Sequence, residues 1–470
     1  MRGIYTLFGI MLCAASATQA TVPDRYLRDS IPSQWNYDAQ YTQTLPSEDN
    51  WWKSLSDPLL DSLISHGIDN NFNITIAARR INIARQTIRN AKAAYYPTLG
   101  ISAGWISSRN SGNTTSTSMP HTDLNYFSTG IDMAWQIDLF GKITSKVKQG
   151  KAQWLATQAE YAATMVSICG DIASAYIRLR TLQTELAVAQ QHLESQRKVL
   201  KIAEARHEAG LASKLDVAQA ATIYYSTEAS IPELESSIKT SINAISILIG
   251  EYPETITSKL VPIKPIPEYR QIVGIGIPLD LLRRRPDIVQ AEYSLAAAAA
   301  AVGIAKKDFL PTLTIEGSIG VASHSIDKIF DSNSFTYSIA PKLSWTIFDG
   351  MARNASLVTA RENMQVAIDQ YNLALMTAVQ EVDNAMVSYK YLLRSIDYLQ
   401  NVVAQAKEAF DLSIDLYKQG LTDFTDVADA QISYLQYSDQ LAVEKGNAAV
   451  ALIKLYEALG GGWNISELIK

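Results

Sequence analysis

The chain has 470 residues, a formal net charge of −6 and a pI of about 5.5. It contains no block of basic residues, which disfavours nucleic-acid binding because such binding needs a basic patch. Its five histidines are scattered, with no pair at the spacing of a metal site on a helix. We therefore expect no bound metal and no cofactor.

Residues 1–20 have the pattern of a secretory signal peptide. Arg2 precedes an apolar run that ends at Ala15, and small residues follow. Cleavage is expected after Ala17 or Ala20. An N-terminal anchor helix is the alternative, but the run is short for a bilayer span. No later stretch has about 18 uninterrupted apolar residues, so the exported chain is expected to lack a membrane-spanning helix.

Two stretches 210 residues apart are alike and indicate an internal two-fold repeat. Residues 206–220 read RHEAGLASKLDVAQA, and residues 417–431 read YKQGLTDFTDVADAQ. Each stretch is predicted to form the tip of a helical hairpin. A glycine and a leucine occupy matching positions in the two tips: Gly210, Leu211, Gly420 and Leu421.

The repeat sets the expected domain organisation. The predicted segments are a signal peptide (1–20), an irregular segment (21–56), repeat 1 (57–250), a proline-rich connector (251–284), repeat 2 (285–460) and a tail (461–470). Each repeat is expected to contain a helix, two strands and a long helical hairpin. The hairpin arms lack proline over most of their length, and residues 142–209 would form a helix of about 100 Å.

Four segments alternate between apolar and polar residues, as strands with one apolar and one polar face do. The predicted strands are 97–108, 125–139, 311–322 and 335–348. In the second, Trp135 belongs to the apolar stripe, and Asp132 and Gln136 belong to the polar one. Strands of about 10 residues can cross a bilayer when tilted. A small soluble sandwich is the alternative, because such strands are common in soluble sheets.

A sheet in lipid cannot leave its edges unpaired, and the smallest known barrels have about eight strands. One chain supplies four strands, so several copies must close the barrel. Two, three or four copies would give 8, 12 or 16 strands. The helices would continue the wall as a tube, and the polar strand face would line a wet lumen. The predicted architecture is an α+β membrane protein that forms a duct.

Asp426 and Asp429 follow the second hairpin tip and lie on one face of a helix because they are three residues apart. Carboxylate rings contributed by several chains would favour cations at an aperture there. The alternative is that both residues are solvated acids near a helix N-terminus, where the dipole favours them.

No catalytic residues are predicted. Residues 100–104 match the G-x-S-x-G hydrolase pattern, but that pattern needs a strand-to-helix elbow, and here it falls inside an expected strand.

Three segments carry a resemblance to a known family. GIPLDLLRRRPDIVQAEYSL with FLPTLTIEGS, DPLLDSLISHGIDNNFNITIAARRI, and DVADAQ resemble the TolC/OprM family of outer-membrane factors, and specifically its OprM-like branch of NodT-type RND efflux outer-membrane lipoproteins. The resemblance implies a homotrimer in the outer membrane of a Gram-negative bacterium, in contact with its lipid. It also implies a 12-stranded barrel continuous with a helical periplasmic barrel.

The same resemblance implies a role and partners. The trimer would be the exit duct for small molecules such as drugs. It would dock to a periplasmic adaptor (a membrane fusion protein) and an inner-membrane pump, commonly of the RND class. The tip residues Gly210, Leu211, Gly420 and Leu421 would meet the adaptor. A duct for type I protein secretion and a periplasmic coiled-coil scaffold without a channel are the alternatives; the RRRPD segment favours efflux.

Residue by residue, Asp426 and Asp429 fall on the aspartates that ring the closed aperture of the family. Tyr417 falls on a tyrosine of the closing contacts. An arginine of those contacts falls on Thr422, so that contact is not expected here. Many members carry an acylated N-terminal cysteine, but Leu12 precedes Cys13 where a small residue is needed, and lipidation is not expected.

Overall fold

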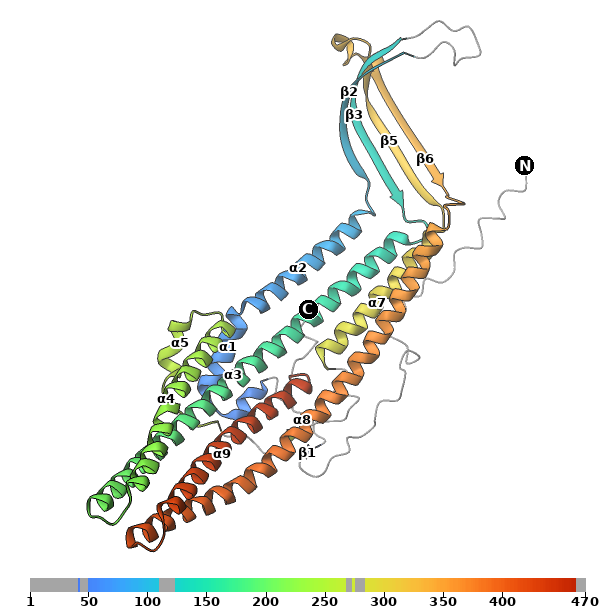
Figure 1. Cartoon of the computed structure of the whole chain (residues 1–470). Coiled ribbons are helices and arrows are strands. Elements are labelled where there is room, and N and C mark those ends of the chain that lie inside the picture. Colours follow the sequence, from blue (N-terminus) through green and yellow to red (C-terminus); the bar gives the residue numbers. More distant parts are fainter. Residues whose placement is uncertain (1–40, 43–49, 110–122, 268–272, 275–283, 462–470) are drawn as a thin grey trace.

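The computed structural model describes residues 41–42, 50–109, 123–267, 273–274 and 284–461. The expected signal peptide, Cys13 and the C-terminal tail beyond residue 461 lie outside the described residues. The chain is elongated, with a sheet at one end and two helical hairpins that reach the other end (Figure 1).

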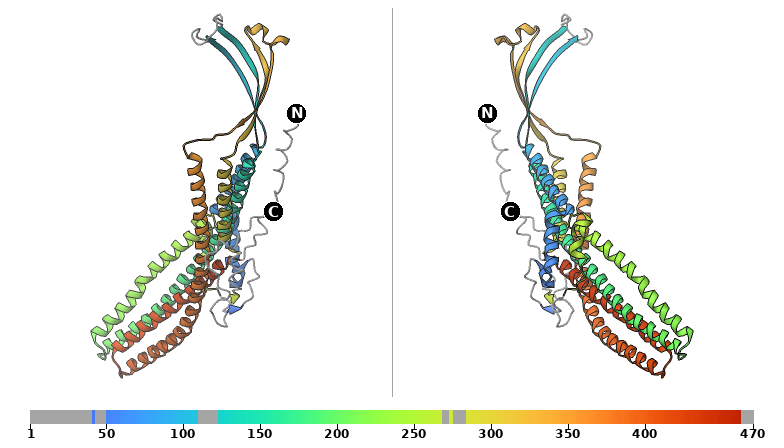
Figure 2. Two further views of the ribbon diagram at one scale, coloured as in Figure 1. Left: turned by 90° about the vertical axis from the view of Figure 1, so that its right-hand side faces the viewer. Right: turned by 90° about the vertical axis from the view of Figure 1, so that its left-hand side faces the viewer.

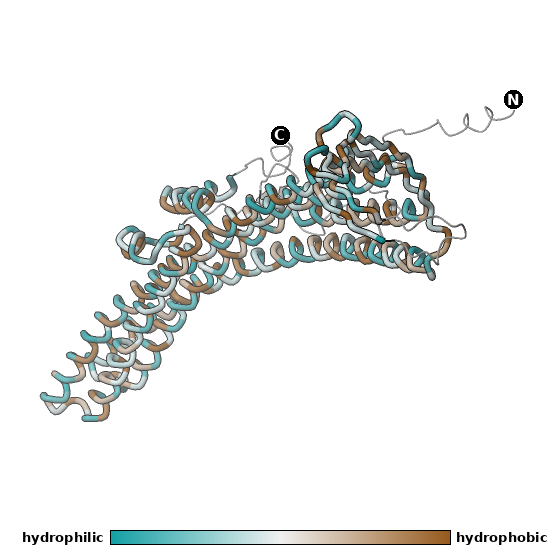
Figure 3. Tube along the Cα trace, turned by 90° about the horizontal axis from the view of Figure 1, so that it is seen from above, coloured by the Kyte–Doolittle hydropathy of each residue, from teal (hydrophilic) through white to brown (hydrophobic). Residues whose placement is uncertain are grey.

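The sheet has four antiparallel strands, as predicted for one chain. In the order β2-β3-β5-β6 they are β2 (Thr98–Arg109), β3 (Asp123–Ile137), β5 (Thr312–Ser323) and β6 (Phe335–Ser344). Every residue of the two outer strands, β2 and β6, is exposed, including Ile101 at 85%. Viewed from above, the sheet is curved, and apolar residues are distributed along its strands (Figure 3). A soluble sandwich would bury its apolar stripes, so this arrangement excludes that alternative within one chain.

A pair of glycines lets the two central strands approach closely. Gly130 of β3 is paired in register with Gly320 of β5. A Cβ atom added to Gly130 would lie 2.7 Å from the carbonyl oxygen of Ile319, and one added to Gly320 would lie 2.4 Å from that of Thr129. Both distances are shorter than a side chain tolerates, so glycine is required at both positions.

The helices form two similar sets below the sheet. In the first repeat they are α1 (Pro58–Asn70), α2 (Phe72–Ala93), α3 (Lys142–Glu208) and α4 (Lys214–Leu248). In the second they are α7 (Pro286–Lys307), α8 (Ala352–Gln419) and α9 (Phe424–Ala458). The α3–α4 and α8–α9 hairpins run side by side to tips at the same end (Figures 1 and 2).

Several expected elements differ from the structure. The first helix is broken at Asn71, whose side chain caps α2. The last strand ends at Ser344 and not near residue 348, and α8 begins at Ala352. The segments expected to be irregular hold a 3-10 helix (Trp51–Leu55) and α5 (Pro253–Leu260). Single-turn helices Ile326–Lys328 and Ser332–Ser334 connect β5 to β6, and β1 (Tyr41–Thr42) pairs with β4 (Val273–Gly274).

Helix α7 is apolar over most of its length, although Glu292 interrupts the run. Among the described residues it is the one helix that is long and apolar enough to cross a membrane, by length and composition. In the structure it packs lengthwise against α3 and α8 (Figure 1). Leu295 of α7, for example, is buried with Ile368 of α8. Its apolar surface is therefore used for helix packing.

Each repeat contains the same joint between an upper and a lower helix. Asn71, at the start of α2, donates from Nδ2 to the carbonyl of Leu248, the last residue of α4, at 2.6 Å. Arg285, just before α7, donates from Nη1 to the carbonyl of Ala458, the last residue of α9, at 2.9 Å. The lower helix thus stops where the upper helix begins, while α3 and α8 pass the joint without a break.

Helices α3 and α9 run antiparallel along a shared line of contact, which we call the α3–α9 seam. A Cβ atom on Gly170 would collide with Glu457, and one on Gly446 would collide with Thr181. Closer to the tips, the His192 ring lies 4.5 Å from that of Tyr434. The seam joins the hairpin of repeat 1 to that of repeat 2.

The seam holds carboxyl groups that are partly removed from solvent. Burial raises the pKa of Glu185 to about 7, and the Asp439 carboxylate adds to the shift. Burial likewise raises the pKa of Glu457 to about 7, where Asp171 adds to the shift and Lys454 opposes it. Asp171 and Asp439 also have pKa values raised by burial. Each contact therefore packs best with its carboxyls protonated.

These shifts predict a stability that depends on pH. Glu185 and Glu457 have a pKa of about 7 in the folded chain and an ordinary value of 4.5 in the unfolded chain, so the folded chain binds their protons more tightly. This tighter binding stabilises the folded state fully below pH 4.5, and the stabilisation is lost as the pH rises through about 7. Buried His192, whose pKa is lowered, opposes this trend below its ordinary value of 6.5. Two glutamates outweigh one histidine, so the Tm should rise by roughly 3–6 °C between pH 8 and pH 6.

Thermal unfolding of the purified chain, followed by tryptophan fluorescence across this range, measures the effect. The variant Glu185→Gln/Glu457→Gln removes both raised groups and should have a Tm that no longer rises on acidification. A wild-type Tm that falls steadily from pH 8 to pH 6 would contradict the assignment.

Candidate functional site at the hairpin tips

Both tips end their first helix with the same glycine-dependent turn. Gly210 and Gly420 have φ angles of +71° and +77°, the left-handed region that glycine adopts without strain. The amide of Leu211 donates to the carbonyl of Arg206 at 2.8 Å, and the equivalent bond in the second tip is 2.9 Å long. These bonds close the last turn of α3 and α8.

The turn leaves a leucine exposed at each tip. Leu211 is 67% exposed and Leu421 is 68% exposed. The two tips differ in how the next helix starts. Ser213 caps α4 by accepting from the amide of Asp216 at 3.1 Å, whereas the side chain of Asp423 makes no such bond at the start of α9. Each tip therefore presents an exposed leucine on a well-defined turn.

Tyr417 is buried between the two hairpins, with 3% of its surface exposed. Its ring meets that of Phe424 edge to face at 5.4 Å, and the Arg206 guanidinium carbon lies 4.7 Å from its centroid. Its hydroxyl donates to Oδ2 of Asp216 at 3.3 Å. Burial raises the pKa of Tyr417, and the Asp216 carboxylate adds to the shift. Tyr417 of the second hairpin is thus held by an acid and a base of the first.

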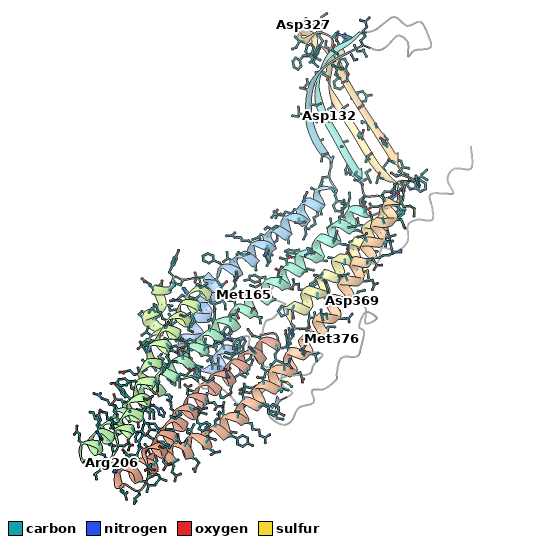
Figure 4. All side chains as sticks on the ribbon, in the orientation of Figure 1. Asp132, Met165, Arg206, Asp327, Asp369 and Met376 are labelled. Atoms are coloured by element: carbon teal, nitrogen blue, oxygen red, sulfur yellow. The ribbon has the colours of Figure 1, made fainter. Side chains whose placement is uncertain are left out.

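Arg206 makes the connection between hairpins stronger. Its Nη1 donates to the backbone carbonyl of Lys418 at 2.8 Å, across 212 positions of sequence. Figure 4 places Arg206 at the end of the molecule where the two tips meet. Below this contact, apolar side chains from both hairpins form a small core: Val199, Ala203, Ala220, Phe410, Tyr417, Phe424, Val427 and Ala428. The tips are thus packed on each other within one chain.

The three predicted gate residues do not gather at one point. Asp426 and Asp429 are exposed on the first turns of α9, and Asp426 accepts a hydrogen bond from the Thr422 hydroxyl. Tyr417 lies on the buried side and contacts the first hairpin. Within one chain, therefore, Asp426 and Asp429 lie on the surface, whereas Tyr417 belongs to a buried contact between the two hairpins.

Sequence reasoning missed Arg206 and Asp216 as site residues. Both lie in the first copy of the repeated tip, and Asp216 aligns with Asp426. The signal that could have found them is the pairing of the two copies, because duplicated hairpins that lie side by side bring equivalent positions together. Thr422, where the family's arginine was expected, binds Asp426 within its own tip.

The remaining chemistry of the described residues is sparse. Among them, no group of three or more His, Cys, Asp or Glu side chains is arranged to hold a metal ion. Ser102 of the G-x-S-x-G match lies within β2, which is not the elbow that the motif requires. Cys169 is buried, and burial raises the pKa of its thiol to about 12, so it is a poor nucleophile.

Comparison with known proteins gives a consistent result. The family described as "Outer membrane efflux protein" matches residues 63–251 and 277–461. The solvent efflux pump outer membrane protein SrpC of Pseudomonas putida is 30% identical over 423 residues, which are 90% of this chain and 89% of that protein. Nodulation protein T of Rhizobium leguminosarum bv. trifolii is 29% identical, with 88% of each chain covered.

The fold agrees with this assignment. The outer-membrane channel OprN superposes with a TM-score of 0.87 at 28% identity, and the match covers 94% of this chain and 99% of that one. The matched segments span both hairpins, the strands and the joints described above. The chain belongs to the outer membrane efflux protein family.

Proposed function

We propose that three copies of the chain form the exit duct of a tripartite efflux system in the outer membrane. The observation that carries the proposal is the four-stranded sheet, which is exposed on its outer strands and stands above helices too long for any membrane. A sheet of this kind is stable in lipid only when β2 and β6 pair with other strands. Three copies supply 3 × 4 = 12 strands, a number within the known range of barrels.

In this arrangement the alternate faces of the sheet meet different solvents. Ile101 and Trp135 belong to the apolar stripes and would face lipid. Asp132 of β3, labelled in Figure 4, lies opposite Gly100 and Ser318 in register, so the polar stripe continues across three strands. The polar stripe would line the lumen, and the helices would carry this lumen into the periplasm.

The tips supply the closure of the duct. Three copies would bring three pairs of Asp426 and Asp429 around one axis, and such a ring would concentrate negative potential and favour cations. The contact of Tyr417 with Arg206 and Asp216 would hold the second hairpin against the first in the closed state. Opening would then require this contact to break and the α3–α9 seam to shift.

The hairpin tips also indicate which proteins the duct would bind. Exposed leucines at both tips give six apolar contact points in a trimer, suited to a periplasmic adaptor protein. The relatives include a solvent efflux pump component and a toluene efflux pump component, both from Pseudomonas putida, which supports small apolar molecules as cargo and an efflux pump as partner. The RND class of that pump is what the resemblance of the RRRPD segment implies. None of these relatives is named for protein secretion.

The carboxylate ring can be tested by electrical recording. In planar bilayers the wild-type protein should give small, cation-selective currents. The variant Asp426→Ala/Asp429→Ala should conduct severalfold more or lose much of its cation preference, because the ring charge is removed. Reversal potentials under a salt gradient measure the selectivity.

Asp415→Ala/Asp423→Ala is the matched control, because both residues are exposed acids of the same tip. If the control changes selectivity as much as the Asp426/Asp429 variant, the effect comes from general surface charge. Unchanged currents in the Asp426/Asp429 variant would mean that these residues do not form a gate and are only solvated acids near the start of α9. Absence of any channel activity in a correctly folded protein would overturn the duct itself.

The contact between hairpins can be tested separately. Asp216→Ala removes the acceptor and Tyr417→Phe removes the donor of the hydroxyl–carboxylate bond, whose loss should cost about 1 kcal/mol of closed-state stability. The open probability in bilayers should therefore rise about fivefold in either variant. The double variant should show little further effect, because both changes remove one bond.

Additive effects of the two substitutions would mean that the residues act independently. An increase in open probability together with a large fall in Tm would indicate general unfolding of the tip. The measurement therefore pairs single-channel recording with thermal unfolding of the same preparations.

A further inference from the structure

The helices directly below the sheet carry an unusual excess of positive charge. Helix α2 has no acidic residue over its 22 positions, and its basic residues are Arg79, Arg80, Arg85, Arg89 and Lys92. Helix α3 has no acidic residue before Glu160, and its basic residues up to that point are Lys142, Lys146, Lys148 and Lys151. The whole chain is acidic, so this excess is local.

Five of these residues share one side of the α2–α3 pair. Arg85, Arg89 and Lys92 follow the i, i+4, i+7 spacing of a helical stripe. The Arg85 guanidinium lies 5.8 Å from the ring centroid of Trp154 of α3, which is one turn beyond Lys151. The basic face is defined as these exposed residues: Arg85, Arg89, Lys92, Lys148 and Lys151.

The chain does not neutralise this face itself. In the described residues none of the five forms an ion pair, and the one hydrogen bond of Arg89 goes to the neutral Gln86. Like charges three or four residues apart destabilise a helix, and no carboxylate of the described residues is paired with the five to offset this repulsion. By contrast, Arg80 on another face of α2 is paired with Glu160 at 2.8 Å.

The nearby acids are already satisfied. Asp138 accepts from the amides of Ile143 and Thr144 at 2.8 and 2.9 Å. Asp308 is paired with Lys142, and Asp349 is paired with Arg353. An anion that offsets the basic face must therefore come from outside the chain.

The position of the face indicates which anion this is. At the base of the sheet, Trp135 donates from Nε1 to the carbonyl of Tyr95 at 2.9 Å, and Trp345 makes the same contact with Phe309. Tryptophans at the end of a barrel mark the membrane–water interface. Lys92 lies six residues before β2, or about 10 Å at helical rise. The side chains of α3 lean toward its N-terminus and thus toward the sheet.

We propose that the basic face binds the phosphate groups of anionic phospholipids in the periplasmic leaflet of the outer membrane. The proposal rests on the insertion of the sheet in that membrane, as set out above. Each basic residue close to a charged membrane surface strengthens the attraction about fivefold at low salt. Residues farther from the sheet contribute less because salt screens them over about 10 Å. Lys92 and Lys148 would therefore dominate, and the lipid would fix the depth of the barrel.

The test is lipid selectivity in reconstituted vesicles. The full chain is placed in phosphatidylcholine bilayers, and spin-labelled phosphatidylglycerol and phosphatidylcholine report the lipids in contact with protein. Wild type should prefer phosphatidylglycerol severalfold, and high salt should reduce that preference. Lys148→Gln/Lys151→Gln should reduce the preference at least twofold, and Arg89→Gln/Lys92→Gln should do so independently.

The matched control is Lys198→Gln/Lys201→Gln, which removes two exposed lysines at the same spacing from the same helix, 50 residues nearer the tip. It should leave the preference unchanged. Wild type without a preference, or an equal loss in the control, would overturn the lipid site and leave the duct intact. Protein that shows no contact with lipid at all would overturn the lipid site together with the proposed barrel.

Discussion

The constraint on which the structure depends is that every backbone amide and carbonyl in lipid needs a partner. Four strands with open edges at β2 and β6 cannot meet it alone, and no described element of the chain covers those edges. The fold therefore becomes complete only through other copies. The long helices below the sheet lie in water, which can hydrogen-bond any backbone group that has no partner in the chain. Their ends and outer faces can therefore stay free to contact other proteins.

The helical part contains two kinds of helix, those that run its full length and those that are interrupted. α3 and α8 run from the sheet to the tips without a break, whereas their neighbours stop and restart at the joints made by Asn71 and Arg285. The largest hydrophobic core of the described residues lies around these joints. A second, smaller apolar core lies at the tips, beside the contact of Tyr417 with Arg206 and Asp216. The α3–α9 seam runs between the two cores.

Much of this organisation was readable from the sequence because the signals were long. Alternation over ten residues gave the strands, and proline-free runs gave α3 and α8. The break at Asn71 was missed because the apolar spacing of the helix pattern continues across it, so the sequence pattern shows no interruption there. The buried position of Tyr417 and the role of Arg206 were missed because they depend on how two hairpins pack, which no local pattern encodes. The exposed aspartates were placed on one face by spacing alone, and their role depends on other copies of the chain.

The joint that occurs once in each repeat has a consequence for the history of the protein. Each repeat contains an entire unit: an upper helix, two strands, a hairpin, and a terminal carbonyl that accepts a hydrogen bond from the residue just before the upper helix. A half-length ancestor could thus have assembled as a ring of six identical subunits with two strands each, matching the twelve of the proposed trimer. Fusion of two such units then freed one copy of each pair to diverge, and the two tips now differ in the Ser213 cap of one and in Asp429 of the other, where the first tip has Gln219.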